Sequence, residues 1–238
     1  MGGNKMEEAY KFGCGRYIQE ADALLRVGEE AKRFGKKALI LAGPTAWKVS
    51  EEKIVRGMKD AGVDYVLHLY GGYPSKRQVD ENAAQFKAEG CTLIIGVGGG
   101  RMMDLAKASA DACACPVINV PTIAATCAAY APLSVIYTDE GRDPEYWWFE
   151  KEVDAIVVDE TIMAHQPARY LASGSLDAIA KFVEVHHNRG TFTPTSVPVD
   201  VYAAYHSAAT TYELLNLFTE QACADVAEGK LTEAVHTV

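Results

Sequence analysis

Three consecutive glycines, Gly98, Gly99 and Gly100, stand between an apolar run and a helical pattern. The apolar run at residues 93–97 predicts a buried strand, and a helix is expected to begin directly after the glycines. Glycine lets the backbone approach a ligand closely, and the unpaired N–H groups at a helix N-terminus face a bound anion. The stretch therefore predicts a site for a phosphate group.

The glycine turn matches the dinucleotide-binding fingerprint only in part. Gly96 and Gly98 fit the G-x-G-x-x-G spacing, but Arg101 stands where the last glycine would be. The acidic residue that binds ribose in that motif, about 20 residues further on, is also missing. A purely structural turn is the alternative, but three glycines ahead of a helix are costly in chain entropy, so phosphate contact is favoured.

Two charged residues follow the glycines on the expected helix. Asp104 and Lys107 are three residues apart, so they could pair on a solvated face, where such a pair contributes about 0.2–0.5 kcal/mol. Asp104 falls in the first turns of the helix, where a carboxylate also suits the helix dipole. A structural role is strongly favoured for Lys107 and less strongly for Asp104.

A second candidate carboxylate, Asp177, lies within the apolar helical segment 171–183. Lys181 and Glu184 fall on the same helix face, four and seven residues later. A carboxylate that faces inward needs a partner, and either a metal ion or Lys181 would serve. Spacing alone favours an internal salt bridge.

The histidines form no recognisable metal-binding or catalytic pattern. His186 and His187 are adjacent and point to different faces of a helix, which favours a solvated helix end. His206 lies among small residues and is expected to be a packing residue. The sequence contains neither a Ser/His/Asp arrangement nor an H-E-x-x-H motif, so no catalytic residue is assigned.

These residues need a scaffold that gathers several strand ends. Short apolar runs alternate with helical patterns up to about residue 122, and this alternation predicts a parallel sheet with helices on both faces. Because the carboxyl ends of parallel strands meet at one edge, the turns there should outline one crevice. The expected strands are 10–15, 37–42, 63–69, 93–97 and a run ending at 120; the expected helices are 18–34, 47–61, 75–89 and one after the glycines; the turns are 43–45, 71–72, 98–100 and 121–122.

The pattern changes after residue 133. Residues 133–138 and 145–150 flank a polar turn and predict a hairpin, and 155–158 predicts one more strand. Only helical patterns follow: 168–187, interrupted by Gly174, then 199–217 and a polar tail. The fold class is therefore α/β: a Rossmann-like parallel-sheet domain over residues 1–159, then a partial all-α domain over residues 160–238.

Composition narrows the class of protein. The chain has 238 residues, a formal net charge of −9 and six cysteines, none in a C-x-x-C pair. The acidic balance argues against a nucleic-acid or membrane-surface binder, but not against one small anionic ligand. The cysteines are expected to be buried thiols in a reducing compartment. With no apparent signal peptide and no apolar run of membrane-spanning length, we expect a cytoplasmic protein.

Taken together, residues 93–138 resemble the iron-containing (group III) alcohol dehydrogenases, the glycerol dehydrogenase family. The blocks that carry the resemblance are GVGGG at 96–100 with Asp104 and Lys107, VPTIA at 120–124, and LSVIYT at 133–138. PAR at 167–169 and GSLDAIAK at 174–181 look like the start of that family's helical domain. The resemblance covers essentially the whole chain.

The resemblance implies an NAD(P)-dependent oxidoreductase of dehydroquinate synthase-like architecture, with zinc or iron in a cleft between two domains. The metal would lower the pKa of a bound alcohol, so that a hydride can pass to the nicotinamide. Asp177 matches the family's metal-binding aspartate. By matching position, the pyrophosphate would lie on Gly98, Gly99 and Gly100, and the rest of the cofactor along Asp104, Thr122, Thr126, Leu133, Val135 and Tyr137.

Three departures from the family pattern affect these expectations. Gly43 replaces the aspartate common in NAD-preferring members, which removes repulsion against a 2′-phosphate and allows NADP. Cys127 replaces an aspartate of glycerol dehydrogenases, so the chain looks more like the hydroxycarboxylate dehydrogenase branch. The family's two metal-binding histidine motifs do not follow Asp177, so the helical domain is expected to be truncated.

The expected function is thus interconversion of an alcohol, glycerol or a 2-hydroxy acid, with its carbonyl. The expected partners are a small-molecule substrate and either a second copy of the chain or a polypeptide that supplies the missing histidines. A nucleotide-binding module without catalysis is the alternative. A sugar-phosphate lyase or synthase resembling dehydroquinate synthase is a third possibility, against which the LSVIYT block argues.

Overall fold

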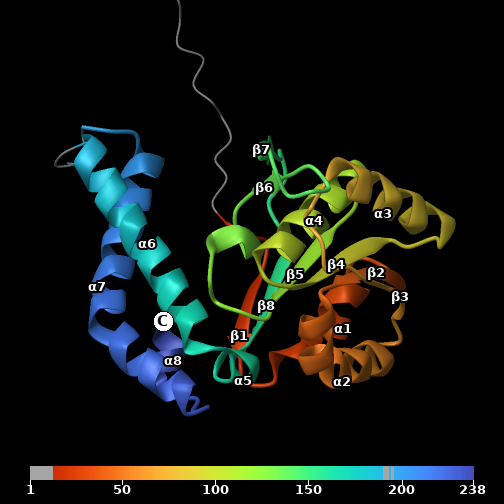
Figure 1. Cartoon of the computed structure of the whole chain (residues 1–238), viewed down its shortest axis with the longest axis horizontal. Helices are drawn as coiled ribbons and strands as arrows, with labels where there is room; N and C mark the ends of the chain where they lie inside the picture. The colour runs from red at the N-terminus through yellow and green to blue at the C-terminus, as the bar shows by residue number, and fades with distance from the viewer. Residues whose placement is uncertain (1–12, 190–192, 194–195) are drawn as a thin grey trace, which may run out of the picture.

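The computed structural model describes residues 13–189, 193 and 196–238. A six-stranded sheet with every strand parallel forms its centre, in the order β1-β8-β5-β4-β2-β3 (Figure 1). The predicted Rossmann-like sheet is therefore confirmed. Its strands are β1 (Tyr17–Glu20), β2 (Lys37–Ala42), β3 (Asp64–Leu69), β4 (Leu93–Gly98), β5 (Val117–Pro121) and β8 (Ala155–Asp159).

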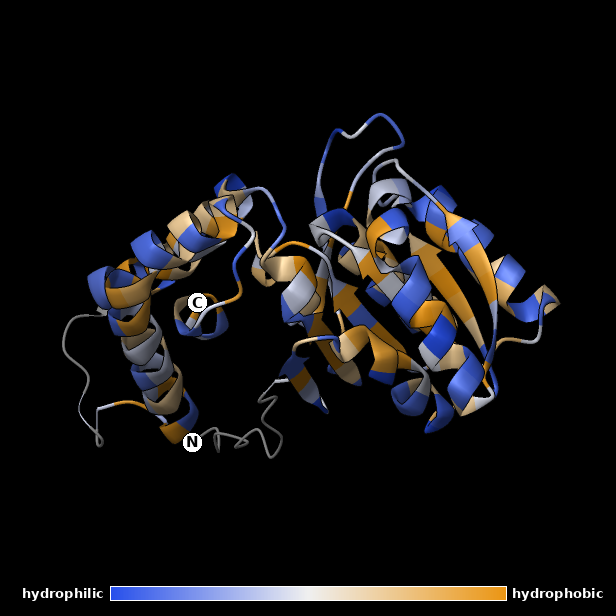
Figure 2. Cartoon of the chain, turned by 90° about the horizontal axis from the view of Figure 1, so that it is seen from below, coloured by the Kyte–Doolittle hydropathy of each residue, from blue (hydrophilic) through white to orange (hydrophobic). Residues whose placement is uncertain are grey.

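Helices cover both faces of the sheet, because successive strand residues point to opposite sides. In β2, Ile40 packs with helices α1 (Val27–Lys32) and α2 (Pro44–Ala61), whereas its neighbour Leu41 packs with α3 (Lys76–Ala88) and α4 (Gly100–Ala112). Figure 2 shows apolar strands between helices whose outer faces are hydrophilic. The continuous apolar runs read from the sequence are the buried strands of this sandwich.

The prediction of one helix over residues 18–34 is wrong for its first residues, which form a strand and a turn. Ile18 pairs with Val157 in the edge strand β1, and the chain then turns through Asp22, whose φ is 59°. Only after this turn do a short 3₁₀ helix, η1 (Ala23–Arg26), and α1 form. The strand expected at 10–15 begins outside the described residues, and residues 13–15 form no strand.

The hairpin and the helical C-terminal part agree with expectation. Strands β6 (Leu133–Ile136) and β7 (Glu145–Trp148) pair antiparallel. After β8 the described residues form helices without a further strand, and none of these helices is long and apolar enough to cross a membrane. The division into domains at residue 159 stays a prediction. The helices are α5 (Glu160–Met163), α6 (Ala168–Arg189), α7 (Val199–Ala227) and α8 (Glu233–Thr237).

The sequence predicts that Gly174 interrupts this helix, but α6 runs through it without a break. Gly174 instead lets α6 pack closely against the sheet domain. A Cβ at Gly174 would lie 2.2 Å from the backbone oxygen of Ala124, in the loop after β5. The glycine is therefore required by the contact between α6 and that loop.

We expect Gly174→Ala to destabilise the chain by about 1–3 kcal/mol, because the added methyl group must push backbone apart. Urea unfolding followed by circular dichroism measures the change. Ser173→Ala, at the exposed neighbouring position, is the control and should stay within about 0.5 kcal/mol of the wild type. Equal stability of the two variants would contradict this reading of Gly174.

Candidate functional site

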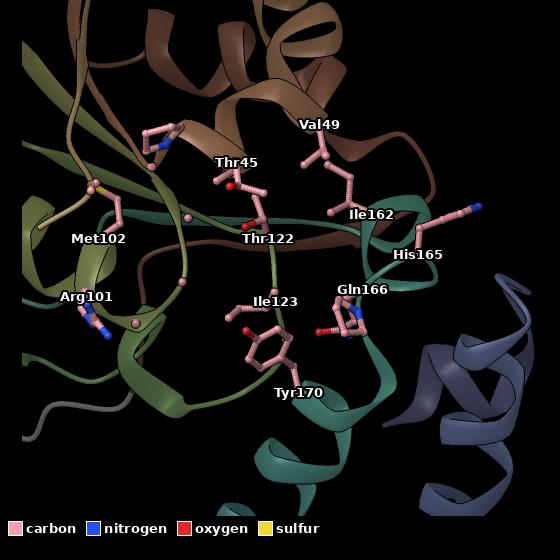
Figure 3. A pocket seen from close by; sticks show the side chains of 18 of the residues that line it. Thr45, Val49, Arg101, Met102, Thr122, Ile123, Ile162, His165, Gln166 and Tyr170 are labelled. Carbon is pink, nitrogen blue, oxygen red and sulfur yellow. The ribbon is translucent and has the colours of Figure 1, made fainter.

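A cleft of about 810 Å³ opens at the carboxyl ends of the parallel strands (Figure 3). The turns after five of the six strands contribute to its walls, so the crevice expected from the sequence exists. The lining residues from these turns are Gly43, Pro44, Thr45 and Ala46; Tyr70, Gly71 and Gly72; Gly98, Gly99, Gly100, Arg101 and Met102; Thr122 and Ile123; and Thr161 and Ile162.

The glycine turn has no room for side chains. A Cβ at Gly98, whose φ is +157°, would lie 2.9 Å from the Cβ of Met102, and one at Gly99 would lie 2.9 Å from a terminal carbon of Ile123. Gly99 is the N-cap of α4 and makes no side-chain capping bond. Backbone N–H groups at the start of α4 therefore border the cleft, as an anion site requires.

The cleft is basic although the protein is acidic. Arg101, His165, Arg169 and Lys53 line it, and its lining in the described part of the chain includes no aspartate or glutamate. The N-terminus of α2, capped by Gly43 without a side-chain bond, adds a second set of helix N–H groups. Because both helix dipoles and the guanidinium groups of Arg101 and Arg169 favour anions, the cleft suits a ligand that carries phosphate groups.

Among the described residues that line the cleft, Lys53 differs from the arginines because its charge is paired with two carboxylates. Its Nζ lies 2.8 Å from Asp22 and 3.0 Å from Asp159, which is 1% exposed. Burial alone would lower the pKa of Lys53, but hydrogen bonds to Asp22 and Asp159 outweigh burial and raise it. Arg101, which lies over the ring of Tyr73 at 4.3 Å, is therefore better placed to meet an anion.

Gln166 offers the cleft a polar group that the protein leaves without a partner. The residue is 5% exposed, and its Oε1 accepts a hydrogen bond from the Ala124 N–H at 2.8 Å. Its Nε2 is buried and has no hydrogen-bond partner among the described residues. Gln166 lines the cleft, but its Nε2 atom is buried in this structure, so the side chain would have to turn before Nε2 could donate to a ligand oxygen.

The residues expected to contact a cofactor fall into three groups. Gly98, Gly99, Gly100 and Thr122 line the cleft. Thr126 lines a second cavity of about 260 Å³, which shares Ile123 and Gln166 with the cleft. Asp104, Leu133, Val135 and Tyr137 line neither cavity; they lie on α4 and at β6, behind the glycine turn.

Asp104 and Lys107 are not on a solvated face, which corrects the expectation from their spacing. Their side chains are 11% and 2% exposed, and Lys107 Nζ lies 3.2 Å from Asp104 Oδ1. Helix α4 is buried because the sheet, α3 and β6 all pack against it. The pair is therefore internal.

The expected salt bridge of Asp177 is wrong. Lys181 pairs instead with Glu184, at 3.2 Å, on the exposed side of α6, and Asp177 is half-buried. His206 is exposed, edge-on to Tyr202 at 4.4 Å, rather than a packing residue. In the described part of the chain no three His, Cys, Asp or Glu residues gather where they could hold a metal. These residues alone do not make a metal site.

The sequence reading missed the cleft wall after β8. His165, Gln166 and Arg169 lie between α5 and the start of α6, and nothing in their own spacing marks them as site residues. The signals available were their position after a parallel strand, where the connecting residues reach the same sheet edge as the glycine turn, and, for Arg169, the PAR block of the family resemblance.

Comparisons with known proteins agree with this geometry. The family model "Iron-containing alcohol dehydrogenase" matches residues 14–160. A glycerol dehydrogenase of Escherichia coli O6:H1 is 36% identical over 170 residues, which are 71% of this chain and 46% of that protein. Hydroxycarboxylate dehydrogenase A of Escherichia coli K12 is 32% identical over 83% of this chain and 53% of its own length.

The solved structures agree as well. The crystal structure of glycerol dehydrogenase from Schizosaccharomyces pombe superposes with a TM-score of 0.85 at 29% identity, covering 97% of this chain and 59% of that one. The chain thus spans about half to three-fifths of the length of these relatives.

Proposed function

The chain belongs to the iron-containing alcohol dehydrogenase family, and we propose that its cleft binds NAD(P) for the interconversion of an alcohol and its carbonyl. The observation that carries the proposal is the glycine turn at the start of α4, set in a cleft lined by cations. A pyrophosphate is the part of a dinucleotide that needs such a turn.

The walls of the cleft suggest which half of the cofactor lies where. Val49 and Ile162 face each other across one end (Figure 3) and offer an apolar slot for the adenine base. The other end borders Arg101, beside Tyr73, which packs against Tyr137 just after β6, and the nicotinamide half would lie there. When bound, the nicotinamide supplies or accepts the hydride.

We propose NADP as the preferred cofactor. Gly43 directly follows β2, at the position where an acidic side chain would meet the adenosine ribose, and no carboxylate among the described residues lines the cleft there. The α2 N-terminus and Thr45 are the nearest groups, and both can donate hydrogen bonds to a 2′-phosphate. NAD would lack this contact.

A 2-hydroxy acid is the proposed substrate class. Cys127 is exposed in the loop after β5, on η2 (Cys127–Ala129), and Ala124 and Ala125 of the same loop contact α6 at Gly174, three residues before Asp177. A thiol at this position does not repel a carboxylated substrate, whereas an aspartate would. The described residues contribute Asp177 alone toward a metal, so further ligands must come from elsewhere for this chemistry.

The first test is a titration of the purified chain with NADPH, followed by nicotinamide fluorescence. We expect saturable binding, and Gly99→Glu should weaken it at least tenfold, about 1.4 kcal/mol, because a carboxylate then occupies the phosphate cradle. Ala84→Glu adds the same charge on the exposed face of α3 and is the matched control. A wild-type chain with no saturable signal for NADPH or NADH would refute the proposal.

Cofactor preference is tested by Gly43→Asp. We expect the ratio of the NADPH and NADH dissociation constants to shift at least tenfold toward NADH, because the new carboxylate repels a 2′-phosphate. Gly43→Ala controls for bulk, since its Cβ would lie 3.8 Å from the Cβ of Ala46, an ordinary contact. An unchanged ratio of dissociation constants in Gly43→Asp would mean that the 2′ position of the adenosine ribose does not lie beside residue 43.

Zinc binding is expected to be weak, because one half-buried carboxylate is a poor ligand set for a metal that usually has at least three protein ligands. Isothermal titration with zinc chloride, followed by dialysis against EDTA and metal analysis, measures it. Asp177→Ala should remove what weak binding there is. Zinc that stays bound at one equivalent after dialysis would contradict this expectation.

A further inference from the structure

A lysine is buried directly behind the glycine turn. Lys107 is 3% exposed, and its ammonium group has three partners. Nζ lies 3.2 Å from Asp104 Oδ1, donates to the backbone oxygen of Ala131 at 2.9 Å, and donates to the backbone oxygen of Leu133. An ammonium group has three hydrogens, so all of them are used inside the protein.

The charge of this pair is costly to keep in the interior. Burial lowers the pKa of Lys107, which the Asp104 charge partly restores, and burial raises the pKa of Asp104 against the opposing effect of Lys107. Buried ion pairs often stabilise a fold no better than apolar side chains of the same volume. A role in fixing the position of one particular segment accounts for the pair better than stability does.

The segment that Lys107 holds is the strap, which we define as residues 122–136. Lys107 binds it at residues 131 and 133, and the hydroxyl of Ser134 donates to the Asp104 backbone oxygen at 2.8 Å. The N–H of Val135 donates to the Asp104 carboxylate. The strap is thus fastened to α4 by four polar contacts from two residues of one helix.

The strap also forms the wall beside the glycine turn. A Cβ at Gly100 would lie 3.1 Å from Cγ2 of Thr126, so the strap and the turn are in close contact. By contrast, Val49 and Ile162, at the other end of the cleft, belong to α2 and α5, and Ile162 packs into the core on the opposite face of the sheet from α4. The two ends of the cleft therefore depend on different packing.

We propose that Lys107 is a positioning residue that sets the strap against the glycine turn for the nicotinamide half of the cofactor, without acting on the adenosine half. The proposal rests on the proposed cofactor site. Lys107 lines neither the cleft nor the second cavity, so it acts through the strap and not by touching the ligand.

The test compares a whole cofactor with its adenosine half. Lys107→Met keeps an unbranched chain of similar length and removes all three hydrogen bonds. We expect its NADPH dissociation constant to rise at least tenfold, while that of 2′,5′-ADP stays within twofold of the wild type. If the wild type binds NADH more tightly, NADH and 5′-ADP are the probe pair.

Hydrogen exchange supplies a readout that does not depend on any ligand. Amides of residues 122–136 should exchange faster in Lys107→Met, and those of α2 should be unchanged. Ser134→Ala removes one uncharged hydrogen bond between the strap and α4. It should likewise weaken binding of NADPH and leave binding of 2′,5′-ADP unchanged. This variant decides the question if Lys107→Met does not fold.

The outcomes are distinct. Equal loss of affinity for NADPH and 2′,5′-ADP in these variants would show a general structural role and overturn the positioning proposal, as would no loss for either probe. A wild-type chain that binds 2′,5′-ADP but not the dinucleotide overturns it too. A wild-type chain that binds neither probe pair would refute the cofactor site itself.

Discussion

The close approach of α4 to β4 is the constraint on which the cleft depends. A Cβ at Gly96 would lie 2.5 Å from the Cβ of Ala106, so an alanine here would force the helix away from the strand. At the end of the strand, the backbone oxygen of Gly98 accepts a hydrogen bond from the Thr122 N–H at 3.0 Å. The next strand end is thereby fixed beside the turn, and backbone rather than side chains faces the cleft there.

The charges of the molecule follow from this arrangement. The chain carries a net charge of −9, yet the cleft gathers cations and two helix N-termini. A positive concavity in an acidic molecule concentrates anions at one place. Lys107 and Asp104 add no net charge when paired, so they can fasten the strap behind the turn without weakening this field.

The sequence was sufficient for features that depend on neighbouring residues. Continuous apolar runs gave five of the six sheet strands, and the glycines located the turn. Three features needed the packed structure. Ile18 fits a helical pattern but pairs as an edge strand, Gly174 looks like a helix breaker but is a contact with Ala124, and Lys107 looks solvated but is covered by elements from other parts of the chain. Each is decided by partners far away in sequence, which local periodicity does not report.

The candidate site also has one part that the sequence predicts and one part that only the packed structure reveals. The half built on consecutive residues, the glycine turn, could be read from the sequence, whereas the wall of His165, Gln166 and Arg169 is formed by packing. The strap joins these halves physically. It touches the turn through Thr126 at Gly100 and touches α6 through Ala124 at Gly174, three residues before Asp177. Because both contacts are too tight to take a side chain without displacement, α6 cannot move closer to the sheet domain without displacing the strap. The strap, which Lys107 holds from behind, therefore contacts both the glycine turn and the part of α6 that carries Asp177.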